Sequence, residues 1–238
     1  MTPDAGPVFD NPAFDAHEQV LFCCDPSVGL RAIIAIPSTR LGPAAGGCRM
    51  YPYPSVDAAL VDVLRLSRGM SYKNALAGLP LGGGKAVVIA DSKSSQKAAL
   101  LEAFARHVQS LGGRYWTAID VGVGVDDVAL ISRHTDYAFC LVNEAAGRLN
   151  PAIFTALGGF VSVRAVAKYL GLGGDSLEGV HVAVQGLGQT GMDLCRQLVE
   201  LGAERRVGPR LGEGDVELLT GGHEGLGDEA ATELAEPT

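Results

Sequence analysis

Residues 81–90 read LGGGKAVVIA, so that one lysine, Lys85, stands between three glycines and a run of apolar residues. The run at 86–90 contains no polar residue and ends before Asp91, a pattern typical of a strand that is buried on both faces. A second apolar run, LRAIIAI at 30–36, predicts another strand. The glycines before Lys85 are expected to form a tight loop at the mouth of the strand.

Apolar residues at helical spacing predict the helices. Ser55 opens one segment whose apolar face carries Leu60, Val63, Leu64 and Met70. Further helices are expected at 100–111, 126–134 and 152–170, and further strands at 115–121, 137–142 and 180–185. Because strands and helices alternate along the chain, the sequence predicts an α/β fold.

Composition excludes several classes of function. The chain has 238 residues, a formal net charge of −8 and an isoelectric point near 5.1, which argues against a nucleic-acid binder. No apolar run approaches the roughly 20 residues that span a bilayer, and the N-terminus lacks the pattern of a signal peptide. The five cysteines include no C-x-x-C pair, so we expect a reduced, cytoplasmic protein without a metal site.

A glycine-rich turn follows the predicted strand at 180–185 and precedes an amphipathic segment. This order of strand, turn and helix is the context that a G-x-G-x-x-G dinucleotide site requires, because the helix N-terminus offers free amide groups to a pyrophosphate. A structural glycine turn is the alternative interpretation. The residues of the turn are Gly186, Leu187, Gly188, Gln189, Thr190 and Gly191.

The composition changes after residue 203. Residues 204–238 contain nine acidic residues, three basic residues and seven glycines, and no aromatic residue. Such a segment buries too little apolar surface to offset its chain entropy, so we expect it to be disordered. A complete dinucleotide-binding domain requires a second strand that ends in an acidic residue after the glycine turn, and the sequence shows no such strand.

Lys85 invites comparison with a phosphate-binding loop, but that interpretation fails. Leu79 stands where the first glycine of the loop belongs, Ala86 replaces the required hydroxyl, and a strand rather than a helix follows. A catalytic role for Lys85 together with Lys73 and Asp120 is the alternative, with Asp120 as acid or base. Taken singly, each of the three also fits a structural or surface role.

Three segments of the chain resemble the leucine/phenylalanine/valine dehydrogenases, which belong to the wider glutamate dehydrogenase superfamily. They are GPAAGGCRM at 42–50, LRLSRGMSYKNALAGLPLGGGKAVV at 64–88 and GGRYWTAIDVG at 112–122. The similarity extends over about residues 10–203. It implies a homo-oligomer that carries out the NAD-dependent oxidative deamination of an L-amino acid to its 2-oxo acid.

The resemblance also implies roles for single residues. Lys85 would activate the water that attacks the imine, and Asp120 would exchange protons with the amino group. Lys73 would bind the substrate carboxylate. The remaining substrate-binding residues would be Gly46, Gly47, Met70, Ala45 and Thr155.

Ala45 occupies the position where glutamate-specific relatives carry a lysine, so the resemblance implies an apolar substrate, branched-chain or aromatic. Asn150 departs from the family pattern just before Thr155. Members of the family continue for more than a hundred residues beyond Gly202, so the chain resembles a truncated or frame-shifted version. A catalytically inactive remnant that binds or oligomerises is therefore the alternative function.

The organisation predicted from these observations has three parts. Residues 1–148 form an N-terminal α/β substrate domain, and residues 149–203 form a connecting helix and the start of a Rossmann-type dinucleotide-binding domain that would bind NAD. Residues 204–238 form the atypical tail.

Overall fold

The computed structural model describes residues 8–140, 151–172, 176–203 and 218–219. The chain divides into two units, Met1–Arg148 and Leu149–Thr238. The mixed arrangement of a sheet and helices agrees with the predicted α/β class.

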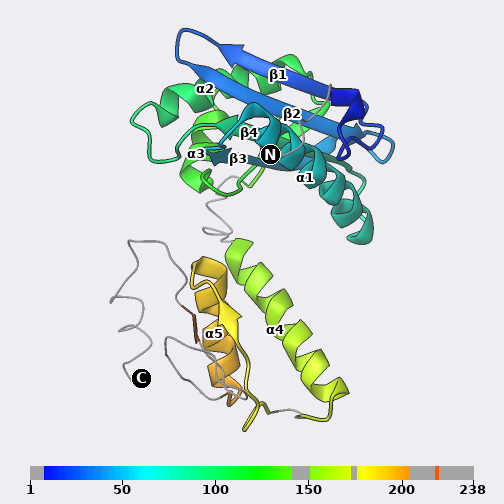
Figure 1. The fold of residues 1–238 in the computed structure, drawn as a ribbon, viewed down its shortest axis with the longest axis vertical. Coiled ribbons are helices and arrows are strands. Elements are labelled where there is room, and N and C mark those ends of the chain that lie inside the picture. The colour runs from blue at the N-terminus through cyan, green and yellow to red at the C-terminus, as the bar shows by residue number, and fades with distance from the viewer. Residues whose placement is uncertain (1–7, 141–150, 173–175, 204–217, 220–238) are drawn as a thin grey trace. The chain divides into compact units, whose positions relative to one another are not determined.

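The first unit contains a five-stranded sheet in the order β1-β2-β4-β3-β5 (Figure 1). Pairing is antiparallel between β1 and β2 and between β2 and β4, and parallel between β4 and β3 and between β3 and β5. The strands are β1 (Gln19–Asp25), β2 (Leu30–Ser38), β3 (Ala44–Tyr51), β4 (Gly82–Ile89) and β5 (Tyr115–Ala118).

Helices cover both faces of this sheet, which explains the continuous apolar runs of β2 and β4. Ile33 of β2 belongs to a core cluster with residues of helix α1, whereas its neighbour Ile34 belongs to a cluster with residues of helix α2. Successive side chains of a strand point to opposite faces, so both faces must be apolar. The helices of this unit are a 3-10 helix η1 (Val8–Asp10), α1 (Val56–Leu76), α2 (Lys97–Ser110) and α3 (Val125–Ile131).

The glycines before Lys85 lie inside strand β4, so the expectation of a glycine loop was wrong. They are required because neighbouring groups approach the strand closely on both faces. A Cβ atom on Gly82 would collide with the carbonyl oxygen of Ser38, and one on Gly83 would collide with Ser71. A Cβ atom on Gly84 would lie 2.7 Å from the ring of Tyr115.

The other predicted elements of this unit differ from the structure mainly at their ends. Helix α1 begins after Ser55 as predicted, with the Ser55 hydroxyl accepting the backbone N–H of Ala58 at 3.0 Å. Strands β1 and β3 were not predicted. The strand expected at 137–142 is reduced, within the described residues, to an isolated bridge between Thr117 and Ala138.

The second unit contains helix α4 (Pro151–Tyr169), strand β6 (Val184–Gln185), helix α5 (Gln189–Glu200) and strand β7 (Leu218–Leu219). Helices α4 and α5 pack together, and Ala167, Cys195 and Leu198 lie in a shared apolar cluster. Strand β6 pairs in parallel with β7, a short strand within the segment expected to be disordered. The rest of residues 204–238 lies outside the described residues.

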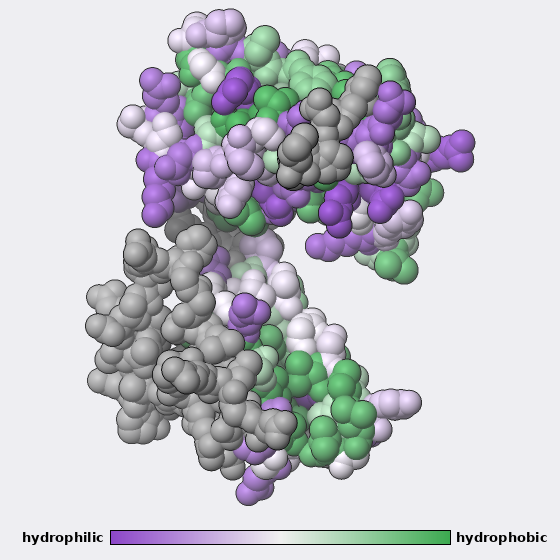
Figure 2. Space-filling model, in the orientation of Figure 1, coloured by the Kyte–Doolittle hydropathy of each residue, from purple (hydrophilic) through white to green (hydrophobic). Residues whose placement is uncertain are grey.

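Helix α4 corrects the expectation that no apolar run is long enough to cross a membrane. This 19-residue helix contains an 18-residue window with a mean hydropathy of 1.2, which suffices by length and composition alone. Core helices of soluble proteins can meet the same criterion, so this is weak evidence for a membrane span. Apolar side chains of α4 are exposed within its own unit, including Phe154 and Val161, and Figure 2 shows hydrophobic surface along this helix.

Candidate functional site

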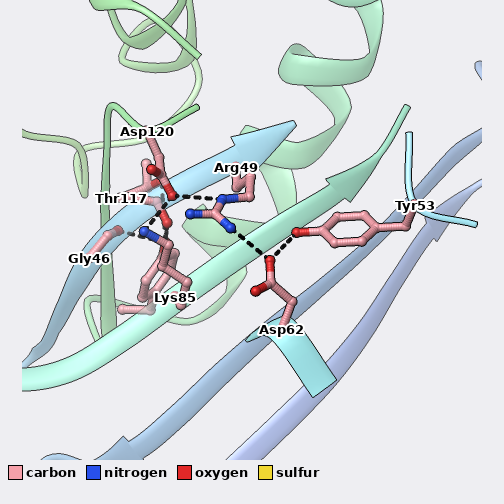
Figure 3. A network of polar contacts seen from close by, with 9 residues as sticks. Gly46, Arg49, Tyr53, Asp62, Lys85, Thr117 and Asp120 are labelled. Atoms are coloured by element: carbon pink, nitrogen blue, oxygen red, sulfur yellow. Dashed lines mark hydrogen bonds and ion pairs between the residues drawn. The ribbon is translucent and has the colours of Figure 1, made fainter. Parts of the chain in front are cut away.

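Lys85 and Asp120 form an ion pair between the Lys85 Nζ and Oδ2 of Asp120 (Figure 3). Lys85 lies in the middle of β4 and is only 7% exposed, and Asp120 follows the end of β5. The structure therefore brings together the two residues that the sequence analysis proposed as catalytic. Lysine side chains are rarely buried unless they are paired with an opposite charge, so this buried pair is a candidate functional site.

The position of Asp120 is fixed by its backbone. Asp120 and Val123 exchange two backbone hydrogen bonds, of 3.1 and 2.9 Å, and Gly122 between them has a φ of 77°. A Cβ atom on Gly122 would collide with the carbonyl oxygen of Met50, and the backbone N–H of Met50 donates to Val121 at 2.9 Å. The loop after β5 is thus attached to β3, which leaves the Asp120 carboxylate at the edge of the sheet.

Gly46 and Gly47 of β3 provide space for this pair. A Cβ atom on Gly46 would collide with the carbonyl oxygen of Gly84, and one on Gly47 would lie 2.9 Å from Cβ of Asp120. The hydroxyl of Tyr115 donates to the carbonyl oxygen of Gly46 at 2.8 Å. Burial raises the pKa of Tyr115 well above its usual range, so this donor keeps its proton.

Helix α1 supplies one wall of the site. The side-chain amide of Asn74 donates to the carbonyl oxygen of Gly82 at 2.8 Å and to that of Ala45 at 3.4 Å. The hypothetical Cβ of Gly46 would lie 3.2 Å from Cγ of Met70, so Met70 lies beside Gly46. Ala45 itself is buried.

Lys73 lies on α1, three residues after Met70, and is exposed. Within the described residues, no ion pair joins its ammonium group to Asp120 or to another carboxylate. The structure thus places Lys73 on the helix that borders the site but shows no contact between it and the ion pair.

Arg49 links Asp120 to a second carboxylate, and the sequence analysis missed this connection. Its Nε lies 3.4 Å from Oδ2 of Asp120, and its Nη1 lies 2.9 Å from Oδ2 of Asp62 on α1 (Figure 3). The same oxygen of Asp62 accepts the hydroxyl of Tyr53 at 2.5 Å. An arginine between Cys48 and Met50 in an otherwise small and apolar stretch was the signal that could have drawn attention to this position.

The network is electrostatically consistent. Burial of the Arg49 guanidinium opposes its charge, but the carboxylates of Asp120 and Asp62 outweigh burial and raise its pKa. Burial, with the hydrogen bond to Asp62, likewise raises the pKa of Tyr53. Arg49 therefore stays charged, and Tyr53 stays a hydrogen-bond donor.

The three glycines of the turn in the second unit have different surroundings. Gly186 has a φ of 90°, which permits the tight turn, and a Cβ atom on Gly191 would collide with the carbonyl oxygen of Gly186. Gly188 caps the N-terminus of α5 and faces open space. Within the part of the chain that the structure describes, no atom lies within 4 Å of a Cβ placed on Gly188, so a pyrophosphate could approach the backbone there, at the N-terminus of α5.

Thr155, the remaining predicted substrate-binding residue, lies in the second unit. Its hydroxyl donates to the carbonyl oxygen of Pro151 at 3.0 Å, within helix α4. Asn150 lies outside the described residues. Among the residues that the structure describes, no group of three or more His, Cys, Asp or Glu side chains is placed to hold a metal ion.

The buried pair of Lys85 and Asp120 beside Gly46 and Gly47 makes this α/β unit a candidate enzyme domain, and the comparisons with known proteins give its family. Residues 17–137 match the family model described as Glu/Leu/Phe/Val dehydrogenase, dimerisation domain. The chain belongs to this family of dehydrogenases.

Several characterised proteins are similar to the chain. A leucine dehydrogenase from Geobacillus stearothermophilus is 52% identical over 188 residues, which cover 79% of this chain and 51% of that protein. A phenylalanine dehydrogenase from Lysinibacillus sphaericus is 47% identical over 188 residues, covering 79% and 49%. The chain thus spans about half the length of the curated relatives that it matches.

Solved structures show the same relationship. The crystal structure of L-tryptophan dehydrogenase from Nostoc punctiforme matches with a TM-score of 0.58 and 45% identity, over 79% of this chain and 53% of that one. A hetero-hexameric glutamate dehydrogenase from Thermus thermophilus matches with a TM-score of 0.69 at 23% identity, over 92% of this chain and 54% of that one, which supports the fold alone.

Proposed function

We propose that the chain carries the substrate-binding and proton-transfer residues of an NAD-dependent amino-acid dehydrogenase. The observation that supports this most directly is the ion pair between Lys85 and Asp120 beside Gly46 and Gly47. The relatives named above act, by their names, on leucine, phenylalanine and tryptophan. The reaction would be the oxidative deamination of an L-amino acid to its 2-oxo acid.

In this reaction Asp120 would accept a proton from the substrate ammonium group, which frees the nitrogen lone pair for formation of the imine. Lys85 would orient the water that attacks the imine carbon and stabilise negative charge on its oxygen. Lys73 would hold the substrate carboxylate as a point charge. The backbone at Gly46 and Gly47 would allow substrate to approach the ion pair closely.

NAD, when bound, would accept the hydride from Cα of the substrate. The residues that would hold its pyrophosphate are those of the turn Gly186–Gly191, with the amide groups at the start of α5 as donors. The exposed face of Gly188 and the contact between Gly191 and Gly186 are the features that fit this role.

An apolar substrate side chain is the second part of the proposal. Ala45 is buried and carries no charge that could pair with an acidic substrate, and Met70 adds an apolar surface beside Gly46. Leucine, valine and phenylalanine are therefore the proposed substrates in preference to glutamate.

A module that binds substrate or a second copy without turnover is the other candidate function. The ion pair and the glycines Gly46 and Gly47 lie in the first unit, and the family model that matches this unit is described as a dimerisation domain. This description favours the binding module. A homo-oligomer is proposed in either case.

The two candidates are separated by titrating the purified 238-residue chain with NAD in a calorimeter and following NADH formation with leucine, valine and phenylalanine. Steady NADH formation that is lost in Lys85→Ala supports the dehydrogenase. Binding of leucine without NADH formation supports the binding module. Absence of binding for every amino acid tested, in a chain that also stays monomeric in sedimentation analysis, would contradict both candidates.

A further inference from the structure

Both cations beside Asp120 contact the same oxygen of its carboxylate. The Lys85 Nζ and the Arg49 Nε each approach Oδ2. The guanidinium of Arg49 is held at its other end by Asp62, which also accepts the hydroxyl of Tyr53. A continuous series of side chains thus connects helix α1 to the carboxylate of Asp120 (Figure 3).

We propose that Arg49 is a positioning residue for Asp120, and that Asp62 and Tyr53 hold Arg49 in this role. The inference rests on the proposed function, in which Asp120 exchanges a proton with the substrate amine. Arg49 would fix the rotation of the carboxylate so that Oδ2 faces the two cations and Oδ1 faces the amine.

Lys85 cannot fix this orientation by itself. An ammonium group is a compact charge whose donors rotate, so it attracts a carboxylate without setting the plane of that carboxylate. The guanidinium of Arg49 adds a second cation, and the hydrogen bond of 2.9 Å from its Nη1 to Asp62 sets its position. Its Nε lies 3.4 Å from Oδ2 of Asp120 without forming a hydrogen bond, so Arg49 attracts this oxygen through its charge and from a second direction.

A purely structural role in joining α1 to β3 explains the network less well. Helix α1 is already attached to the sheet by the hydrogen bonds of Asn74 and by the apolar cluster of Leu60, Val63 and Leu64. The side chains of Arg49 and Asp62 are 24% and 29% exposed, and partly solvated ion pairs add little to stability. The network is better placed to orient a carboxylate than to hold the fold together.

The test compares two ligands that differ only in the amine. Binding of L-leucine and of 4-methylpentanoate, which lacks the amino group, is measured by calorimetry for the full chain and for Asp62→Asn. We expect Asp62→Asn to weaken the binding of leucine roughly tenfold or more, the usual effect of one hydrogen bond to a charged group, with little change for 4-methylpentanoate. The matched control is Asp25→Asn, which removes the carboxylate on β1 that pairs with Arg106 on α2.

A second variant guards against a loss of folding. Tyr53→Phe removes only the hydroxyl that contacts Asp62, and we expect the same selective loss for leucine, but smaller. Equal losses for the two ligands in both variants, or no loss in either, would overturn the proposal, because a general structural defect does not distinguish an amine.

A measurement without ligand separates this proposal from the proposed function. The Arg49 Nη1–H group donates to Asp62 at 2.9 Å, so its signal in a nitrogen-15 NMR spectrum reports whether the guanidinium is held. We expect its exchange with water to become about tenfold faster in Asp62→Asn and to stay unchanged in Asp25→Asn. If the unmodified chain bound neither ligand, the proposed function would fail, and an unchanged Arg49 signal in Asp62→Asn would overturn the positioning role separately.

Discussion

Lys85 and Asp120 form an ion pair although strand β3 lies between the strands that lead to them. The pair can form because the residues of β3 at this point, Gly46 and Gly47, have no side chains. A Cβ atom on Gly47 would lie 2.9 Å from Cβ of Asp120, so even one methyl group would push the carboxylate away from the lysine. The glycine pair is thus a condition for the ion pair.

This relationship predicts that Gly47→Ala disrupts the site. The added methyl would meet Asp120 and the carbonyl oxygen of Ile119, and overpacking of this kind costs about 1–3 kcal/mol of stability. We also expect the binding of leucine to be lost, as measured by calorimetry. Gly69→Ala is the control, because Gly69 lies in helix α1 and faces open space. Alanine there should raise stability by about 0.5–1 kcal/mol. Equal effects of the two substitutions in urea unfolding would contradict this account.

The same requirement explains which parts of the structure could be predicted from the sequence. Strands β2 and β4 and helix α1 are evident because their buried faces are continuously or periodically apolar. Strand β3 is not, because its sequence AAGGCRMY contains small residues where a buried strand would usually carry large ones. Because the space beside Asp120 requires glycines in β3, this strand lacks the run of large apolar residues by which a buried strand is recognised.

The site was predictable to a smaller extent. Lys85 and Asp120 stood out as residues, but the choice between catalytic and structural roles came from the family resemblance. The link from Arg49 to Asp62 joins a strand to a helix across a loop, and no spacing rule indicates such a contact. The start of β4 at Gly82 was missed because glycines usually mark a turn, whereas here they allow close packing within a strand.

Lys85→Met is expected to separate binding from chemistry. The methionine fills much of the buried volume but cannot donate to water or stabilise a charged oxygen. We therefore expect kcat for NADH formation to fall by roughly 10²–10⁴, with a much smaller change in KM. Steady-state kinetics with leucine measure both. A rise in KM with kcat unchanged would show that Lys85 only binds substrate.

His17 predicts a dependence of stability on pH. Its Nε2 lies 3.2 Å from the carbonyl oxygen of Leu64 and 3.1 Å from the hydroxyl of Ser67, and its Nδ1 accepts the backbone N–H of Asp15. Burial lowers the pKa of His17 below 6.5, outweighing the hydrogen bond to Leu64 and the charge of Asp15, both of which favour protonation. The unfolded chain thus binds the proton more tightly than the folded one.

The contribution of neutral His17 to stability is therefore complete above pH 6.5 and is lost as the pH falls from 6.5 toward the lower folded-state pKa. The loss has a limit of about 1.4 kcal/mol per pH unit. Urea unfolding between pH 7.5 and 5 measures it, and His17→Gln should flatten this part of the profile. A profile that keeps its full slope in His17→Gln would assign the dependence to other groups.

Ala45 leads to a prediction about specificity. Because the residue is buried and uncharged, a substrate carboxylate at this end of the site would lose its hydration without gaining a partner. We expect leucine and phenylalanine to bind at least roughly tenfold more tightly than glutamate. Competition calorimetry measures the ratio of the affinities. Tighter binding of glutamate would show that a cation elsewhere in the site pairs with the side-chain carboxylate of the substrate.

The glycine turn of the second unit allows a matched pair of substitutions, one at Gly191 and one at Gly188. In Gly191→Ala the new methyl would collide with the carbonyl oxygen of Gly186, so we expect the second unit to lose about 3 kcal/mol of stability. In Gly188→Ala the methyl would point into open space, and the cost should be about 0.5–1 kcal/mol, because glycine is preferred to alanine at a helix N-cap.

For NAD affinity the order of the two variants should be reversed: when each variant is measured while folded, Gly188→Ala should have the larger effect. Gly188→Ala places a methyl on the face where a pyrophosphate would approach the backbone, and we expect the affinity for NAD to fall roughly tenfold. Gly191 lies on the side of the turn that faces the strand, so Gly191→Ala should act on NAD binding only through the folded fraction. Calorimetric titration with NAD, together with circular dichroism to give the folded fraction, measures both effects. If Gly188→Ala bound NAD as tightly as the unmodified chain, the turn would have a structural role alone, and the cofactor site would have to lie elsewhere.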